Sequence, residues 1–146
     1  MERRQLMFAG VALCIVSPRP AAAASEDLQA AVRDFTGGET PRQGRVQLDI
    51  APLVENGNTV PLSVSADSPM TQADHVSAIA IFNERNPQRD VAVFHLTPRS
   101  GRASVSTRIR LANSQTLVAV ARMSDGSYWS TSVYVIVTLA GCIDGS

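Results

Sequence analysis

Two cysteines and two histidines are the side chains of this 146-residue chain best suited to nucleophilic or metal chemistry. Cys14 lies near the N-terminus, four residues follow Cys142, and the histidines are His75 and His95. A thiolate can act as a nucleophile or a metal ligand, and imidazole can act as a general base or a ligand. Whether these residues can act together depends on the segments that hold them.

Residues 1–24 have the pattern of a secretory signal peptide. Arg3 and Arg4 give it a basic start, an apolar run covers residues 6–16, and the alanines at 21–24 supply an Ala-x-Ala cleavage site. The apolar run is shorter than the about 20 residues needed to span a bilayer. The arginine pair predicts export by the twin-arginine route. An ordinary Sec signal that happens to hold two arginines is the alternative.

Cleavage of this signal is expected to leave an exported protein, residues 25–146, with one cysteine. Removing three arginines and one acid from the thirteen of each leaves ten arginines and twelve acids, a net charge of about −2. No basic patch for nucleic acid or for an anionic membrane is therefore expected. A lipoprotein signal at Cys14 is disfavoured, because Leu13 stands where such a signal needs a small residue.

Cys142 is then the only thiol of an exported protein. A structural free cysteine is usually buried, whereas Cys142 follows the last strand-like run among small residues, with Gly141 and Gly145 on either side. An unpaired cysteine in an oxidising compartment suggests intermolecular pairing or a reactive role. The tail offers no fixed geometry for catalysis, which depends on orientation, so the sequence favours a carrier thiol. A passive thiol is the alternative.

The histidines do not complete a recognisable site. His75 has Met70 nearby in the sequence, but one histidine and one methionine are too few ligands for copper. His95 lies in a predicted strand. We interpret both histidines as structural or solvent-exposed, and we predict no metal, no cofactor and no catalytic residue.

The spacing of apolar residues predicts one short helix followed by a β-domain. Leu28, Ala31, Val32 and Phe35 recur at helical spacing, so a helix is expected over 26–35, with Ser25 as its N-cap and two glycines after it. From residue 46 the period changes to two. Seven strands are expected at 46–50, 60–64, 76–82, 91–96, 103–111, 116–123 and 128–139, with a turn at 55–58.

Seven short strands separated by regular turns favour an immunoglobulin-like β-sandwich. The predicted organisation is a signal peptide at 1–24, a helix and linker at 25–43, the sandwich at 44–139 and a flexible carrier tail at 140–146.

Several segments resemble the SoxY family, the sulfur-carrier subunit of the periplasmic thiosulfate-oxidising system. The resemblance covers nearly all of the mature chain in order. It implies an immunoglobulin-like sandwich that forms a heterodimer with SoxZ, a second small β-sandwich. It also implies that sulfur intermediates are bound covalently to Cys142 and presented transiently to separate oxidising and hydrolysing enzymes. The segments are Val60-Pro61-Leu62-Ser63-Val64, Asp67-Ser68-Pro69-Met70-Thr71, Asn86-Pro87, residues 101–111, residues 119–126 and Gly141-Cys142.

The tail departs from the Gly-Gly-Cys-Gly-Gly pattern of that family. Ala140, Ile143 and Asp144 replace three glycines, which makes the tail stiffer and places a carboxylate two residues from the thiol. A divergent paralogue, in which the sandwich is a binding or assembly module and the cysteine carries nothing, therefore remains an alternative. A thiol enzyme acting alone is a third, but a disulfide oxidoreductase normally needs a second cysteine.

Overall fold

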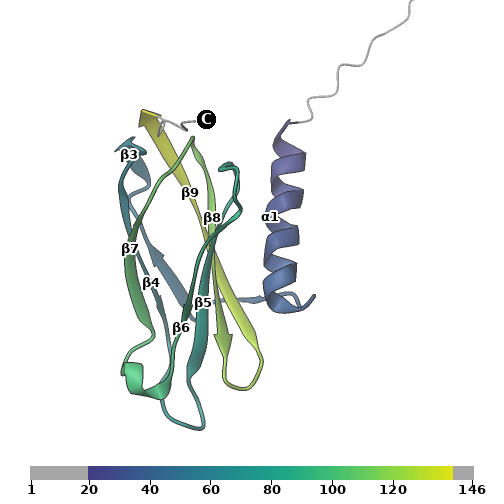
Figure 1. Cartoon of the computed structure of the whole chain (residues 1–146), viewed down its shortest axis with the longest axis vertical. Coiled ribbons are helices and arrows are strands. Elements are labelled where there is room, and N and C mark those ends of the chain that lie inside the picture. Colours follow the sequence, from purple (N-terminus) through teal and green to yellow (C-terminus); the bar gives the residue numbers. More distant parts are fainter. Residues whose placement is uncertain (1–19, 140–146) are drawn as a thin grey trace, which may run out of the picture.

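A computed structural model describes the backbone of residues 20–139 and the side chains of residues 25–139 (Figure 1). Within that range, one helix lies against a sandwich of two β-sheets. The elements are α1 (Pro20–Thr36), β1 (Arg42–Gln43), β2 (Val46–Asp49), β3 (Leu53–Asn56), β4 (Val60–Ala66), β5 (Val76–Asn83), β6 (Asp90–His95), the short 3-10 helix η1 (Pro98–Ser100), β7 (Ser104–Ile109), β8 (Gln115–Met123) and β9 (Tyr128–Leu139).

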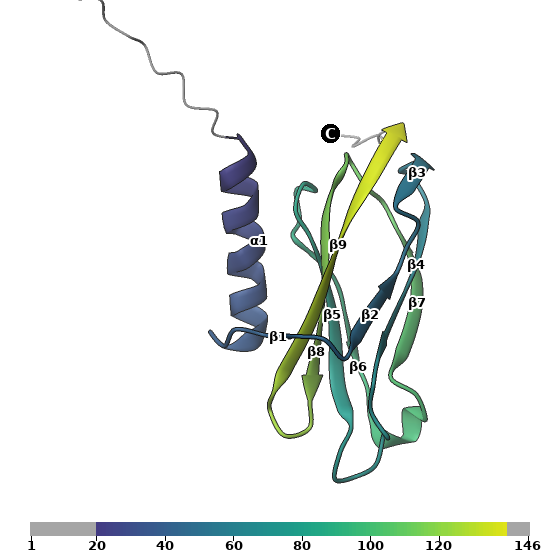
Figure 2. The same ribbon diagram turned by 180° about the vertical axis from the view of Figure 1, so that it is seen from behind.

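The larger sheet has the strand order β1-β9-β8-β5-β6, and β3 also pairs with β9. The smaller sheet has the order β2-β4-β7. β1 and β3 run parallel to β9, whereas the other paired strands are antiparallel. The two sheets face each other (Figure 2), which confirms the predicted β-sandwich.

Alternating side chains of both sheets form the core between them. On β8, Leu117, Ala119 and Ala121 are fully buried, while Thr116 and Val118, which alternate with them, are half-buried. The strand period of two sends the first set inward and the second set outward. The inward set continues on the neighbouring strands with Val60, Leu62, Val64, Ile79, Ile81, Ile109 and Val135.

The helix α1 covers part of the outer face of the larger sheet, over β5 and β8. Phe35 meets Phe82 and Tyr128 edge to face, with ring centroids 5.9 Å and 6.0 Å apart. A single ion pair among the described residues, Arg89 with Asp27 at 3.2 Å, also ties α1 to the sandwich. Burial on both faces explains why nearly every residue of β5 is apolar. Leu28, Ala31, Val32, Ala80, Val118 and Val120 complete this second apolar cluster.

The predicted start of the helix is wrong, and its predicted end is confirmed. Instead of starting after an N-cap at Ser25, α1 begins at Pro20. Proline suits the first turn of a helix and alanine is the best helix former, so the alanine string extends the helix. Gly37 and Gly38 end it with φ of 66° and 95°, where left-handed backbone favours glycine. Within the described residues no helix is both long and apolar enough to cross a bilayer.

All seven predicted strands form, but the sequence did not predict β1 and β3. Residues 55–58 were expected to be a turn, whereas β3 continues to Asn56 and only the next residues turn. In that turn the Asn56 side chain accepts a hydrogen bond from the Asn58 amide at 2.9 Å. Both missed strands are short and pair only with β9, far away in the sequence. No local pattern could have revealed them.

We predict that Leu117→Ala lowers the free energy of unfolding by about 2–5 kcal/mol, because it leaves a cavity between the two sheets. Leu53→Ala is the matched control, since Leu53 is 54% exposed and Leu117 is fully buried. The measurement is urea unfolding followed by the fluorescence of the single tryptophan, Trp129. Equal losses in the two variants would contradict the assignment of the core.

Candidate functional site

The predicted sulfur-attachment residue and the predicted export signal lie outside the residues that the structure describes. This holds for Cys142, for Gly141 and Gly145 beside it, and for Arg3 and Arg4. The structure does describe the place where the tail begins. We call the end of β9 around Leu139 the tail root.

Backbone hydrogen bonds connect the tail root to the β3–β4 turn and, through that turn, to the chain that follows β7. The Gly57 amide donates to the Leu139 carbonyl at 2.9 Å, and the Gly57 carbonyl accepts from the Leu111 amide at 2.8 Å. In the register of β3 with β9, Asn56 lies opposite Leu139. The last residue before the tail is therefore held to the β3–β4 turn, which is itself held to the end of β7 (Figures 1 and 2).

Side chains extend this anchoring where β8 and β9 separate. The Ser114 hydroxyl accepts a hydrogen bond from the Val137 amide at 2.8 Å and lies 3.4 Å from the Val137 carbonyl. On the other side of β9, the Thr138 hydroxyl donates to the Glu55 carbonyl at 3.3 Å. The last residues of β9 are thus hydrogen-bonded on one side to the loop before β8 and on the other side to β3.

Hydrogen bonds of the buried Gln115 and the half-buried Asn86 join the loops at the same end of the sandwich. Gln115, which is fully buried, accepts from the Arg85 amide at 2.8 Å and donates to the Asn86 side chain at 2.9 Å. Asn86 donates to the Arg110 carbonyl at 2.7 Å and accepts from the Ala112 amide at 3.0 Å. Buried polar groups are costly unless paired, and these pairs tie the β5–β6 loop to the β7–β8 loop beside the tail root.

Apolar side chains lie exposed next to the tail root. Leu53, Tyr134, Ile136 and Leu139 are 54%, 58%, 47% and 68% exposed. Leu53 lies opposite Ile136 in the register of β3 with β9. The sequence analysis did not single out these residues. The signal was the apolar run from 133 to 137, since a strand that is apolar at consecutive positions has apolar side chains on both faces.

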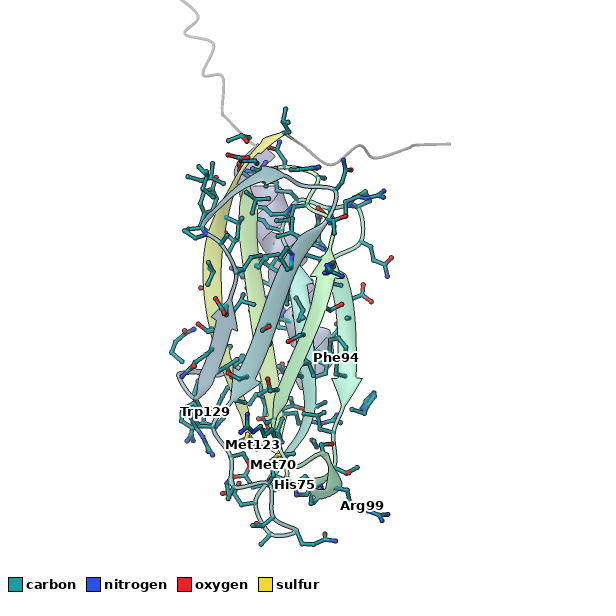
Figure 3. All side chains as sticks on the ribbon, turned by 90° about the vertical axis from the view of Figure 1, so that its left-hand side faces the viewer. Met70, His75, Phe94, Arg99, Met123 and Trp129 are labelled. Carbon is teal, nitrogen blue, oxygen red and sulfur yellow. The ribbon has the colours of Figure 1, made fainter. Side chains whose placement is uncertain are left out.

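The histidines lie at neither the tail root nor a shared site. His75 and Met70 are at the opposite end of the sandwich (Figure 3), where the His75 Nδ1 is 3.0 Å from the Thr71 carbonyl. The Met70 sulfur accepts a hydrogen bond from the Val76 amide at 3.4 Å, and His95 is exposed on β6. No group of three His, Cys, Asp or Glu side chains able to hold a metal occurs among residues 25–139.

One carboxyl far from the tail root has a perturbed pKa. The hydroxyl and amide of Ser127 donate to Asp125 at 2.6 Å and 2.9 Å, which lowers the pKa of that carboxyl, and Arg45 lowers it further. Asp125 lies in the β8–β9 turn, so its charge does not act on the tail root.

An open groove of about 730 Å³ lies on the outside of the smaller sheet, along β4 and β7. The Ser63 and Ser106 hydroxyls in it are 2.7 Å apart, and Asp49 and Arg108 lie at its sides. No histidine or cysteine lines it, so this groove offers no strong nucleophile.

The model of the family described as sulfur oxidation protein SoxY matches residues 32–142. The solved structure of the sulfur carrier protein SoxY from Chlorobium limicola f thiosulfatophilum is 27% identical, with a TM-score of 0.68, and the match covers 80% of this chain and 96% of that one. No curated protein matches the chain.

Superoxide reductases share the fold alone. The neelaredoxin from Ignicoccus hospitalis is 16% identical with a TM-score of 0.57, and the match covers 64% of this chain and 80% of the neelaredoxin chain. A putative superoxide reductase from Thermotoga maritima is 19% identical with a TM-score of 0.55, and the match covers 71% of this chain and 90% of that reductase. At such identities the likeness concerns the arrangement of strands.

We predict that Gln115→Leu lowers the free energy of unfolding by about 1–3 kcal/mol, because the Arg85 amide and the Asn86 side chain lose a buried partner. Gln47→Leu is the matched control, since Gln47 is exposed on β2. Urea unfolding gives the free energies, and hydrogen exchange of the Arg85 amide reports the loosened loop. A Gln115→Leu protein with unchanged stability and exchange would refute the role of the network.

Proposed function

The chain belongs to the SoxY family of sulfur oxidation proteins, and we propose that it is a sulfur carrier that holds thiosulfate-derived intermediates covalently on Cys142. The observation that carries this proposal is the family match, which runs through the mature chain and ends on Cys142. The 27%-identical neighbour, named a sulfur carrier protein, matches over nearly its whole length.

The position of the tail root supports this role. Leu139 is hydrogen-bonded to the β3–β4 turn, and Cys142 follows three residues later. At about 3.3–3.6 Å per extended residue, the sulfur can stand roughly 10 Å from the strand end. That reach lets the thiol enter the cleft of another enzyme while the sandwich stays outside.

The chemistry needs enzymes besides the carrier. Joining the Cys142 thiol to thiosulfate forms an S–S bond and releases one proton and two electrons, so an oxidising enzyme with its own electron acceptor must perform this step. Hydrolysis of the resulting S-thiosulfonate then releases sulfate and leaves a persulfide on the cysteine. An ordinary thiol with a pKa of about 8.5 is only a few per cent thiolate at neutral pH. A cationic or metal environment in those enzymes would promote the first step.

The location and the partner follow from the same proposal. The mature protein, from about residue 25, works in the periplasm after twin-arginine export, and it forms a heterodimer with a SoxZ-like β-sandwich. It meets the thiosulfate-oxidising enzymes transiently, through the tail at 140–146. It needs no cofactor other than the sulfur on Cys142.

The residues beside Cys142 favour a second candidate function. Ile143 and Asp144 stand beside the thiol where the family pattern has glycine, and a carboxylate there repels an anionic cargo. A paralogue that uses the sandwich as an assembly module, with a cysteine that carries nothing, is the competing function.

We predict that Cys142→Ser keeps the fold but abolishes thiosulfate-dependent turnover in the system reconstituted from its host, because an alcohol cannot accept the sulfane linkage. Cys14→Ser in the precursor is the matched control, since this cysteine leaves with the signal. Intact mass spectrometry of the purified wild-type protein should show a sulfur adduct that the Cys142→Ser protein lacks. Full turnover by Cys142→Ser, or a wild-type protein that never carries an adduct, would favour the assembly module.

We predict that replacing Arg3 and Arg4 together by lysine traps unprocessed precursor in the cytoplasm, because twin-arginine recognition requires the arginine pair. The measurement is the precursor-to-mature ratio in cell fractions, with Arg19→Lys as a control inside the same signal. Normal processing of the double variant would show that the chain uses a Sec signal instead.

A further inference from the structure

Two arginines from one short segment of chain cover the indole of Trp129. The guanidinium carbons of Arg42 and Arg45 lie 5.8 Å and 5.4 Å from the centroid of the Trp129 ring, which is within the range of a cation–π contact. Trp129 is half-buried and packs against the core between the sheets, whereas Arg42 is exposed and Arg45 is half-buried. We call these three residues the arginine–indole cluster.

Hydrogen bonds hold the segment that carries both arginines. The Gly44 amide donates to the Ser130 carbonyl at 3.2 Å, and the Asp67 amide donates to the Arg45 carbonyl at 2.8 Å. The Arg45 side chain donates from Nη2 to the Asp67 carbonyl at 3.0 Å. Arg45 has a φ of 57°, a left-handed backbone that residues with a Cβ seldom adopt and that is common at functional sites. The Arg45 guanidinium is therefore held over the indole without a ligand.

The positive charges of the cluster are incompletely balanced. Neither arginine has an ion pair in the part of the chain that the structure describes, where only Arg89 pairs with Asp27. The pKa of Asp125 is lowered mainly by its hydrogen bonds from Ser127 and in smaller part by Arg45, so this carboxylate offsets some of the Arg45 charge. Two like charges on one ring repel each other, and an anion bound to both relieves that repulsion.

The geometry of a guanidinium indicates which class of anion fits. Each guanidinium has five N–H donors in one plane, and stacking on an indole occupies the flat face but leaves the N–H edge free. Arg45 uses one donor on the Asp67 carbonyl. Such edges bind the paired oxygens of oxyanions through charge-assisted hydrogen bonds. A dianion matches two arginines better than a single carboxylate does.

The cluster is far from the place where Cys142 would carry sulfur. Trp129 is the second residue of β9 and Leu139 is the last. At about 3.3 Å per strand residue, these two residues lie roughly 33 Å apart along the strand. Figure 3 shows Trp129 toward the end of the sandwich that holds Met70 and His75. An anion bound here is therefore separate from any cargo on the tail.

We propose that Arg42 and Arg45, held on the indole of Trp129, form a binding site for a tetrahedral dianion. Sulfate, thiosulfate and hydrogen phosphate share this shape and charge. The site goes beyond the proposed carrier function, because it does not involve Cys142. Since Arg42 lies on β1 and Trp129 on β9, a bound anion would stabilise the β1–β9 contact and with it the folded chain.

The single tryptophan of the chain is a direct probe of this site. The full mature protein is titrated with sodium sulfate while sodium chloride is lowered to keep the ionic strength constant, and the emission of Trp129 is recorded. Two charge-assisted contacts predict a saturable change with a dissociation constant of about 1 mM. Parallel titrations with thiosulfate and phosphate distinguish the sources. Tighter binding of phosphate than of either sulfur oxyanion would support the site and assign it to phosphate.

Charge variants show which residues bind the anion. Arg42→Gln should weaken sulfate binding at least about tenfold. Arg99→Gln is the matched control, because Arg99 is an exposed arginine on η1, outside the cluster, and it should change the affinity less than about twofold. Asp125→Asn should tighten binding by up to about fivefold, because it removes a negative charge that offsets Arg45. Arginines that only cover the indole would not produce this response.

Urea unfolding with and without sulfate gives a second readout. Sulfate stabilises proteins in general, so the proposal requires a larger gain in the wild-type protein than in Arg42→Gln. Arg45→Gln is the second variant if Arg42→Gln does not fold. Equal binding by the wild-type protein and Arg42→Gln, or an emission change that chloride reproduces, would overturn the site. Cys142→Ser should bind sulfate as the wild-type protein does, so loss of the site would leave the carrier function untouched.

Discussion

The pairing of β9 constrains the whole molecule. This twelve-residue strand bonds to β8 along one edge, and along the other edge to β1 near its start and β3 near its end. Between those two contacts the chain crosses to the smaller sheet to form β2. The pairing therefore connects the two sheets, sets which side chains of β9 point into the core, and fixes where the C-terminal tail begins.

The two faces of β9 have different consequences. Inward, Val135 is completely buried, and Val133 and Val137 pack against the same core. Outward, Tyr134 and Ile136 remain exposed, and neither belongs to the apolar cluster beneath α1. Since successive strand residues alternate between faces, one apolar run both stabilises the sandwich and leaves Tyr134 and Ile136 exposed on its outer side.

The end of the sandwich around the tail root is held by many hydrogen bonds. Gln115 and Asn86 cross-link the β5–β6 and β7–β8 loops, and Ser114 bonds to the backbone of β9. This end of the sandwich therefore gives the last described residue of β9 a fixed position, and Cys142 follows three residues later in the sequence. The histidines and Met70 lie elsewhere, hydrogen-bonded to backbone or exposed, and take no part in this arrangement.

The sequence alone determined the seven main strands, the end of the helix at two glycines and the solitary cysteine of the predicted mature chain. Each of these depends on local patterns: alternation with a period of two, left-handed backbone at glycine, and a count of residue types. Only the tertiary structure decided the rest. β1 and β3 form because β9 offers them an edge, and Leu53 becomes exposed beside Ile136 because their strands pair across more than eighty residues. Gln115 is buried and paired because the distant β5–β6 loop meets it through Arg85 and Asn86. No local pattern encodes these contacts, since each depends on which segments the sandwich brings together.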